Sequence, residues 1–405
     1  MNSFKFYPVG QGLFYSGSLF GGNYNFVYDC GTESQQEYLN NAMELYIEEL
    51  KRNAGEAVIE FVVISHLHKD HFSGLYSLAK QARIKKLYLP YLGNTPSLIS
   101  LVLANAIYNT NAEETNSYND ELFHFMRMLY RIDEYTNNFP QIESIIIEKN
   151  DEDVSGELEN DRVFFIRRKT ITSPVGNEQW EFIFFNHSIS LYKMKELEQK
   201  VKDELTKNKA HDIVQLIQSK NGISKIADIY KTVFQEEIKK DRNHLNLTSI
   251  ILIHFPTNSK LTSQYYNGCE KINVKENLTK ENYCESYFSS WLGACNYRDK
   301  ASLASILTGD AMINEAIAEL LRQQLNIHMS HENIMCGFLQ IPHHGSKHNW
   351  KELKKSHIDA FVNVISFGLG NRHHHPHAQT INELIHDKKT VYLVNQIDDF
   401  KYCLK

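Results

Sequence analysis

Four side chains of types that bind metal ions stand within six positions of the sequence: His66, His68, Asp70 and His71. Imidazole and carboxylate groups suit zinc, manganese or iron, and a catalytic metal needs about three protein ligands and one open position. In an extended chain alternate residues share a face, so positions 66, 68 and 70 should point the same way, with His71 turning in at the start of a helix. The chain has 19 histidines, so a single one means little, but this spacing predicts a metal centre.

The sequence around this run predicts how it is positioned. Residues 58–65 are nearly all apolar, which is typical of a strand buried on both faces. Ser65 and Gly74 suit a tight turn from that strand into a helix. Other predicted strands cover residues 23–28, 85–89, 142–147, 163–167, 181–185, 248–254, 303–308, 337–342, 360–366 and 390–394. Helical patterns lie near 35–53, 72–83, 97–132, 190–240, 311–326, 350–356 and 378–387. This alternation predicts a layered α/β fold.

The run at 66–71 resembles the signature of the metallo-β-lactamase superfamily. Other motifs resemble a subgroup that includes the hydrolase domain of ComEC-type competence proteins, a nuclease domain. Upstream these are Val-Gly-Gln-Gly at 9–12 and Asp-Cys-Gly at 29–31. Downstream they are Leu-Thr-Gly-Asp at 307–310, Pro-His-His-Gly-Ser at 342–346 and Ser-x-Gly-x-x-Asn-x-x-x-His-Pro at 366–376. Two positions depart from the subgroup, because Leu13 and His68 stand where it often has aspartate.

The resemblance implies an αββα sandwich, the metallo-β-lactamase fold, with large helical insertions. We expect residues 1–405 to form one elaborated domain, because no repeat, low-complexity tract or linker divides the chain. Three polar or charged stretches are predicted to be insertions that decorate or cover a site, at about 94–140, 190–240 and 257–300.

The resemblance also implies roles for individual residues. We expect the metal ligands to be His66, His68, Asp70, His71, Asp310 and His343. We expect the catalytic residues to be Asp70, His344 and His375, and the substrate-binding residues to be Ser346, Asn371 and Asn246. Asp29 is expected to be a buried support that accepts hydrogen bonds near the metal loop. His373, His374 and His377 are expected to lie on a loop surface.

Two assignments stay open in the sequence. Either His343 or His344 can be the ligand, and we favour His343, with the other available for proton transfer. The third motif of the superfamily, normally a histidine before a strand, has three candidates here: Asn246, His244 and His187.

The predicted function is hydrolysis by a hydroxide held between two divalent ions, zinc or manganese, about 3.5–4 Å apart. A phosphodiesterase or nuclease acting on DNA, RNA or nucleotides is the leading hypothesis, because of the subgroup motifs. The alternatives are a small-molecule ester or lactone hydrolase, and a metal-stabilised subunit that binds a protein partner through its insertions.

The composition limits the substrates, the bonds between cysteines and the cellular location that we expect for this protein. The formal net charge is −6, which argues against a broad basic face for a long nucleic acid. The six cysteines form no C-x-x-C pair and are expected to be free thiols. We see neither a secretory signal nor an apolar run of the roughly 18–20 residues that a membrane span requires, so the expectation is a cytoplasmic protein without a membrane part.

Overall fold

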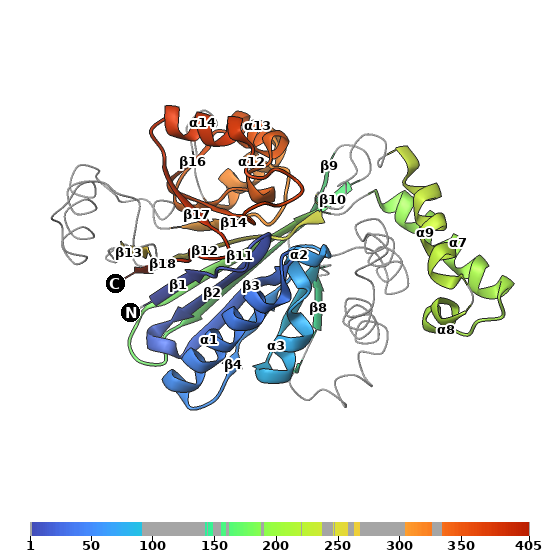
Figure 1. The fold of residues 1–405 in the computed structure, drawn as a ribbon, viewed down its shortest axis with the longest axis horizontal. Coiled ribbons are helices and arrows are strands. Elements are labelled where there is room, and N and C mark those ends of the chain that lie inside the picture. The colour runs from blue at the N-terminus through green and yellow to red at the C-terminus, as the bar shows by residue number, and fades with distance from the viewer. Residues whose placement is uncertain are drawn as a thin grey trace.

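The computed structural model describes residues 2–90, 142–143, 145–148, 155–158, 162–187, 190–219, 221–236, 246, 248–257, 263–267, 304–325 and 334–404. Two eight-stranded sheets pack face to face between outer layers of helices (Figure 1). This is the αββα sandwich that the sequence predicted.

The first sheet is built mainly from the N-terminal part of the chain. Its strands, in spatial order, are β13 (Ser263–Asn267), β18 (Phe400–Leu404), β1 (Asn2–Phe6), β2 (Gly12–Leu19), β3 (Tyr24–Thr32), β5 (Phe61–Val63), β7 (Leu87–Pro90) and β8 (Ile145–Glu148). The helices that cover its outer face are α1 (Gln36–Ala54), α2 (Lys69–Phe72) and α3 (Leu75–Gln81) (Figure 1).

The second sheet comes mainly from the C-terminal part. Its strands, in spatial order, are β17 (Thr390–Val394), β16 (Ile358–Ser366), β15 (Ile334–Gln340), β14 (Ser305–Leu307), β12 (Ile251–Pro256), β11 (Gln179–His187), β10 (Arg162–Thr172) and β9 (Ser155–Leu158). The helices of its outer layer are α12 (Glu315–Gln324), α13 (Lys347–Lys355) and α14 (Ala378–His386) (Figure 1).

Alternation along the strands creates the three apolar layers of the sandwich. In β3, Phe26 and Tyr28 point into the layer between the sheets, while Val27 points toward the helices of the first sheet. In β12, Leu252 faces the layer between the sheets and Ile253 faces the C-terminal helices. Because both faces of these strands are covered, their sequences are almost wholly apolar.

The strand before the metal motif differs from its prediction. Residues 58–65 were expected to form one strand, but they divide into β4 (Val58–Ile59), which pairs with β6 (Arg83–Ile84), and β5. The division falls at Glu60, whose backbone N–H donates to the carbonyl of Asn25 at 2.7 Å. β5 is still a strand of the first sheet, and Ser65 follows shortly after its carboxyl end.

The predicted insertions are described only in part. Within 190–240 the chain forms α7 (Leu191–Lys207), α8 (Ile213–Gln218) and α9 (Gly222–Val233), at one end of the sandwich (Figure 1). The predicted helix at 97–132, and all of 257–300 except residues 257 and 263–267, lie outside the described residues. None of the helices in the described part of the chain has the length and apolar character that a bilayer span requires. Cys30, Cys336 and Cys403 are buried, and the other cysteines lie outside the described residues.

Candidate metal centre

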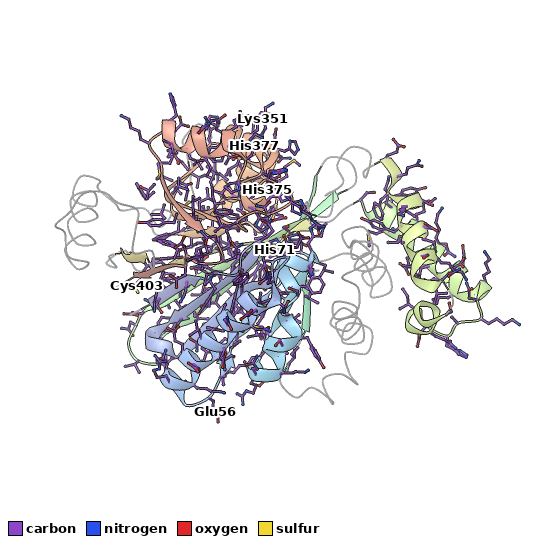
Figure 2. All side chains as sticks on the ribbon, viewed as in Figure 1. Glu56, His71, Lys351, His375, His377 and Cys403 are labelled. Atoms are coloured by element: carbon purple, nitrogen blue, oxygen red, sulfur yellow. The ribbon has the colours of Figure 1, made fainter. Side chains whose placement is uncertain are left out.

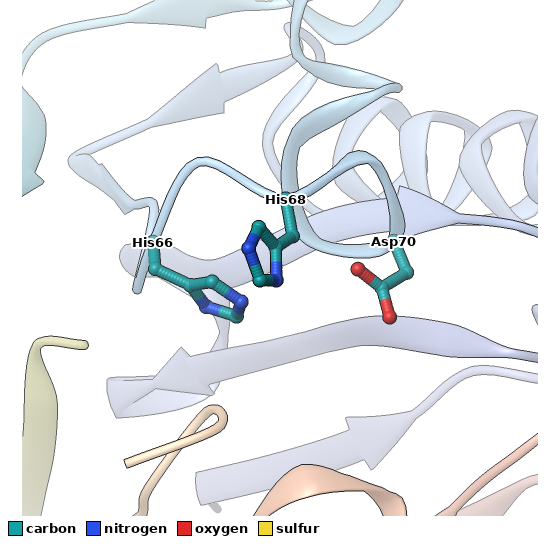
Figure 3. Close-up of side chains that lie close together, drawn as sticks. All are labelled: His66, His68 and Asp70. Carbon is teal, nitrogen blue, oxygen red and sulfur yellow. The ribbon is translucent and has the colours of Figure 1, made fainter. Parts of the chain in front are cut away.

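The loop between β5 and α2 presents the predicted metal run. His68 has an extended backbone and is the N-cap of α2, so the chain turns there and brings Asp70 and His71 back toward His66. Figure 3 shows the side chains of His66, His68 and Asp70 on the same side of this loop. His66 and His71 are fully buried.

Three groups of potential metal ligands meet at this loop. In each group the candidate ligand atoms all lie within 4.8 Å of one another. The groups are His66, His68 and Asp70; His66, His71 and Asp310; and Asp70, His71 and His344. Because the groups share members, they form one cluster, which we call the metal cluster: His66, His68, Asp70, His71, Asp310 and His344.

Asp310 reaches the cluster from the turn that follows β14. The side-chain oxygen of Gln340 accepts hydrogen bonds from the backbone N–H groups of Thr308 and Gly309, each at 2.8 Å. The Gln340 amide also donates to the Gly309 carbonyl at 3.0 Å. Gly309 has a φ of +54°, and a Cβ there would lie 2.6 Å from the Ser65 hydroxyl. Glycine is therefore required where this turn approaches the metal loop.

The distances inside the cluster are short for groups this deeply buried. Asp310 Oδ1 lies 3.2 Å from His71 Nε2, and Asp310 Oδ2 lies 3.6 Å from His66 Nε2. Asp70 Oδ2 lies 3.0 Å from His344 Nε2. Each carboxylate thus faces the Nε2 atoms of imidazoles, and both are donor types that could hold a divalent cation.

Outer hydrogen bonds fix which ring nitrogens face the cluster. Asp29 is fully buried and accepts from the Ser65 backbone N–H at 2.6 Å and from the Ser65 hydroxyl at 2.7 Å. It also lies 2.7 Å from His71 Nδ1, which therefore donates to it. His344 Nδ1 likewise donates to the Ser366 carbonyl at 2.8 Å. The expectation that Asp29 supports the loop and a histidine is confirmed, and both rings are left with Nε2 facing inward.

Unpartnered atoms test whether the cluster fits a metal. His66 Nε2, His71 Nε2 and Asp310 Oδ1 are buried and make no hydrogen bond. A buried polar atom without a partner costs about 1–3 kcal/mol. Divalent cations bound among these atoms would satisfy all three, and the imidazole and carboxylate donors suit zinc, manganese or iron. The residues therefore fit a metal centre.

The carboxylates dominate the electrostatics of the cluster. Burial alone would lower the pKa values of His71 and His344, but Asp310 and Asp70 raise both, and a bound cation would replace the protons that these two rings hold. Burial, together with repulsion from His71 and His68, lowers the pKa of His66 well below its usual range, so this ring is a neutral donor. Burial alone would raise the pKa of Asp310, but the histidines around it, His343 and His71 foremost, lower it well below its usual range. Ionised carboxylates and neutral imidazoles are the protonation states that bind a cation.

The adjacent residues His343 and His344 occupy different environments. Both lie in the short turn η4 (His343–Gly345) and both have left-handed backbones. The His344 ring is buried and belongs to the metal cluster, whereas the His343 ring is 17% exposed and belongs to none of the three groups. His343 Nε2 lies 3.6 Å from Asp310 Oδ2. The geometry thus favours His344 as the ligand, the reverse of the assignment that we favoured from the sequence.

Asn246 and Ser346, both expected to bind substrate, line one pocket together with His343. Asn246 donates from its amide to Asp310 Oδ2 at 3.2 Å. Of the other third-motif candidates, His187 ends β11, and His244 lies outside the described residues. Ser346 is the N-cap of α13 and accepts from the Asn349 backbone N–H.

The loop at 366–377 carries His375 to the edge of the cluster. The side-chain oxygen of Asn371 accepts from the backbone N–H groups of His373 and His375, at 3.0 and 3.1 Å. Asn371 therefore shapes the loop. The His375 ring centroid lies 5.1 Å from that of His343, and its Nδ1 is buried without a partner. His373 and His374 are exposed and His377 is half-buried; His373 pairs with Glu33 at 3.0 Å.

Sequence reasoning missed some residues that hold the site. Gln340 positions the turn of Asp310, and Asn349 donates to the carbonyl of Asp310 at 3.1 Å. Gln340 and Asn349 are single polar residues that belong to no spacing pattern typical of a metal or catalytic site. Only the resemblance to whole motifs around them gave any signal.

Comparison with known proteins identifies the N-terminal part of the fold. Residues 13–97 match the family model of the metallo-beta-lactamase superfamily, and this segment contains the whole run from His66 to His71. This segment is therefore similar to the metallo-beta-lactamase superfamily.

Solved structures give only distant similarities. A diphosphatase of the PhnP family is 12% identical over 45% of this chain, with a TM-score of 0.17, and the match spans 62% of that protein. A HARLDQ motif mutant of a metallo-beta-lactamase from Cronobacter sakazakii is 10% identical over 59% of this chain and 95% of its own, with a TM-score of 0.20. A beta-lactamase from Chitinophaga pinensis is 12% identical over 60% and 93%, also with a TM-score of 0.20. A search of curated protein sequences gives no match.

Proposed function

We propose that this protein is a metal-dependent phosphodiesterase or nuclease whose metal cluster holds two divalent ions, zinc or manganese. The observation that carries the proposal is the convergence of six ligands with three unpartnered buried atoms among them. When bound, the ions would supply an activated water and stabilise the charge that develops on substrate oxygens.

The charge of the cluster favours an anionic substrate over a neutral one. With metal bound to neutral imidazoles, its charged side chains would be two carboxylates, Asp70 and Asp310, whose pKa values lie below the usual range. Two divalent ions would outweigh these charges and leave the centre positive. Such a centre attracts the negative charge of a phosphodiester, whereas its electrostatic attraction for a neutral ester or lactone is weaker. The motifs that resemble the competence subgroup support the same choice.

The chain's own residues have distinct tasks in this proposal. His66, His68, Asp70, His71, Asp310 and His344 are proposed as ligands, and Asp29 holds the His71 ring in the required tautomer. His375 is proposed to donate a hydrogen bond to the substrate. Burial and the nearby His343 lower the pKa of His375 to about 3, so at pH 7 it donates as a neutral ring.

The test is hydrolysis of bis-p-nitrophenyl phosphate by purified protein with manganese or zinc added. We expect turnover by the wild type and by the His374→Ala variant, which alters an exposed histidine outside the cluster. A p-nitrophenyl ester and a lactone should be poor substrates. Hydrolysis of the ester or lactone without hydrolysis of the phosphodiester would overturn the proposal, as would the absence of any hydrolysis.

The substrate class can be narrowed with the same protein. Single-stranded DNA, duplex DNA, RNA and cyclic nucleotides should be compared by their products. We expect short or single-stranded substrates to be preferred, because the acidic chain neutralises little of a long duplex backbone outside the metal centre. Faster nicking of closed circular duplex DNA than of short oligonucleotides, at equal phosphate concentration, would contradict this preference.

A further inference from the structure

A pocket of about 250 Å³ lies beside the metal cluster, where η4, the loop at 366–377 and the first turn of α13 meet. In Figure 2, His375 and His377 lie between His71 and the outer end of the C-terminal layer. The residues that line the pocket include His343, His375, Lys347, His348 and Asn246.

The pocket continues directly from the cluster. Asn246 lies 3.2 Å from Asp310 through its amide nitrogen, and His343 Nε2 lies 3.6 Å from the same carboxylate. A molecule bound at the metal cluster can therefore extend into the pocket.

The lining is suited to an anion. It contains a lysine, five histidines, two asparagines and a serine, and no carboxylate. Each imidazole has at least one N–H donor whether it is neutral or protonated. The pocket is thus a concentration of hydrogen-bond donors around one lysine, in a chain whose net charge is −6.

The start of α13 adds to this preference. Ser346 caps the helix through the Asn349 N–H, and Lys347 and His348 occupy its first two positions at the pocket wall. The first N–H groups of a helix have no partner within the helix, and the helix dipole there attracts anions.

An independent feature points to a ligand. Asn246 is only 4% exposed, and its side-chain oxygen makes no hydrogen bond. Its amide nitrogen must face the Asp310 carboxylate, so the oxygen is the atom left without a partner. This oxygen can accept a hydrogen bond from a hydroxyl or N–H group of a ligand. The combination of an anion site with an acceptor fits a phosphate carried on a sugar or nucleoside.

We propose that this pocket binds a second phosphate group of the substrate, next to the phosphodiester at the metal cluster. Lys347, His348 and the start of α13 would hold that phosphate, and Asn246 would accept from the sugar or base beside it. The assignment of this phosphate to a substrate rests on the proposed function. It narrows the substrate to molecules with two neighbouring phosphates, such as a nucleic-acid strand or a nucleotide that carries a second phosphate.

The first experiment measures binding of inorganic phosphate to the metal-loaded full chain by calorimetry. Wild type, Lys347→Gln and Lys351→Gln are compared. Lys351 lies one turn further along α13, is exposed and does not line the pocket (Figure 2). Phosphate bound at the metal cluster contributes equally in all three proteins. A lost charge-assisted hydrogen bond corresponds to about a tenfold weaker affinity, so we expect that loss in Lys347→Gln and no change in Lys351→Gln. Equal affinity in Lys347→Gln and wild type would overturn the pocket assignment.

The second experiment compares thymidine 5′-(p-nitrophenyl phosphate) with the same ester carrying a 3′-phosphate. We expect the 3′-phosphate to lower KM about tenfold in wild type, an advantage that Lys347→Gln loses and Lys347→Arg keeps. Equal KM values for the esters with and without the 3′-phosphate would overturn the proposal. If phosphate binds through Lys347 but neither ester is cleaved, the pocket assignment is supported and the proposed phosphodiesterase activity fails.

Discussion

In the described part of the chain, two groups of buried polar side chains differ in kind. One is the metal cluster. The other lies between the two sheets, where the Tyr15 hydroxyl contacts His254 Nε2 and the Tyr402 hydroxyl, each at 2.8 Å, and Tyr402 contacts the Ser305 hydroxyl at 2.6 Å. We call these four residues the inter-sheet network. Both groups join segments that are far apart in the sequence.

The difference between them shows what marks a metal site in this fold. The inter-sheet network contains no carboxylate, and its hydroxyl groups bond to one another. The metal cluster brings two carboxylates against four imidazoles, and three of its inward atoms have no partner. His254 Nδ1 is also buried without a hydrogen-bond partner, so a buried histidine with an unpartnered nitrogen does not by itself indicate a ligand, whereas one that faces ionised carboxylates does.

Replacing Asp310 is the strongest way to test this contrast. Asp310→Ala removes a carboxylate that faces both His66 and His71. We expect metal-dependent turnover to fall by more than the roughly 100-fold that outer hydrogen-bond partners of a metal site contribute. Steady-state kinetics measures this, and circular dichroism should show that the fold is kept. Activity close to wild type would show that Asp310 is not a ligand. Asp70→Ala should have the same effect.

The inter-sheet network should respond to pH through stability. Burial lowers the pKa of His254 to about 3. The unfolded chain, with a histidine pKa near 6.5, binds this proton more readily, so stability is complete above pH 6.5 and is lost as pH falls toward 3. Between pH 7 and pH 4.5 this amounts to about 3 kcal/mol of unfolding free energy.

Urea unfolding of wild type and His254→Gln across this range isolates that contribution. Glutamine can still bond to Tyr15 but does not titrate, so the variant should lose about 3 kcal/mol less than wild type between the two pH values. Identical pH profiles would show that His254 keeps its ordinary pKa.

Asp29 provides an intermediate case, because it is buried next to the cluster without joining any of the three ligand groups. Asp29→Asn keeps an acceptor for Ser65 but weakens the hold on His71 Nδ1. We expect about 10–100-fold weaker metal affinity, measured by competition with a chelating dye. Unchanged affinity would show that the His71 tautomer is fixed by something other than Asp29.

The smallest effect is expected for His374→Ala. This side chain is exposed on the loop of His375 and contributes to neither buried group. Metal affinity and turnover should both stay within about twofold of wild type. Surface substitutions that touch neither a buried core nor a buried polar group change the unfolding free energy by only about 0.5 kcal/mol or less, and this residue is none of the proposed ligands. A large loss of bound metal would show that His374 contributes to the metal site.

The contrast between the two polar groups also explains what the sequence could predict. The run from His66 to His71 is contiguous, so its spacing alone indicated a metal site and a strand-to-helix turn. The layered α/β character was readable from apolar runs, because strands covered on both faces are almost wholly apolar, and the αββα arrangement followed from the resemblance to the metallo-β-lactamase superfamily. The inter-sheet network was not predicted, because its members are single residues in four separate strands.

Other features depended on backbone geometry that the sequence does not reveal. His343 and His344 are the same residue type at adjacent positions, and only the left-handed turn at η4 decides which ring enters the cluster. Asn371 was expected to bind substrate, yet its side chain bonds to its own loop. The break at Glu60 in the predicted strand likewise follows from a hydrogen bond between its backbone N–H and the carbonyl of Asn25 in β3.

The most direct test of the central claim is the metal content of the protein. Wild type reconstituted with zinc or manganese and freed of excess metal should contain about two ions per chain by elemental analysis. The Asp310→Ala variant should retain fewer, while His254→Gln, which alters the other buried group, should retain the same number as wild type. Wild-type protein that binds no zinc, manganese, iron or nickel after reconstitution would contradict the account.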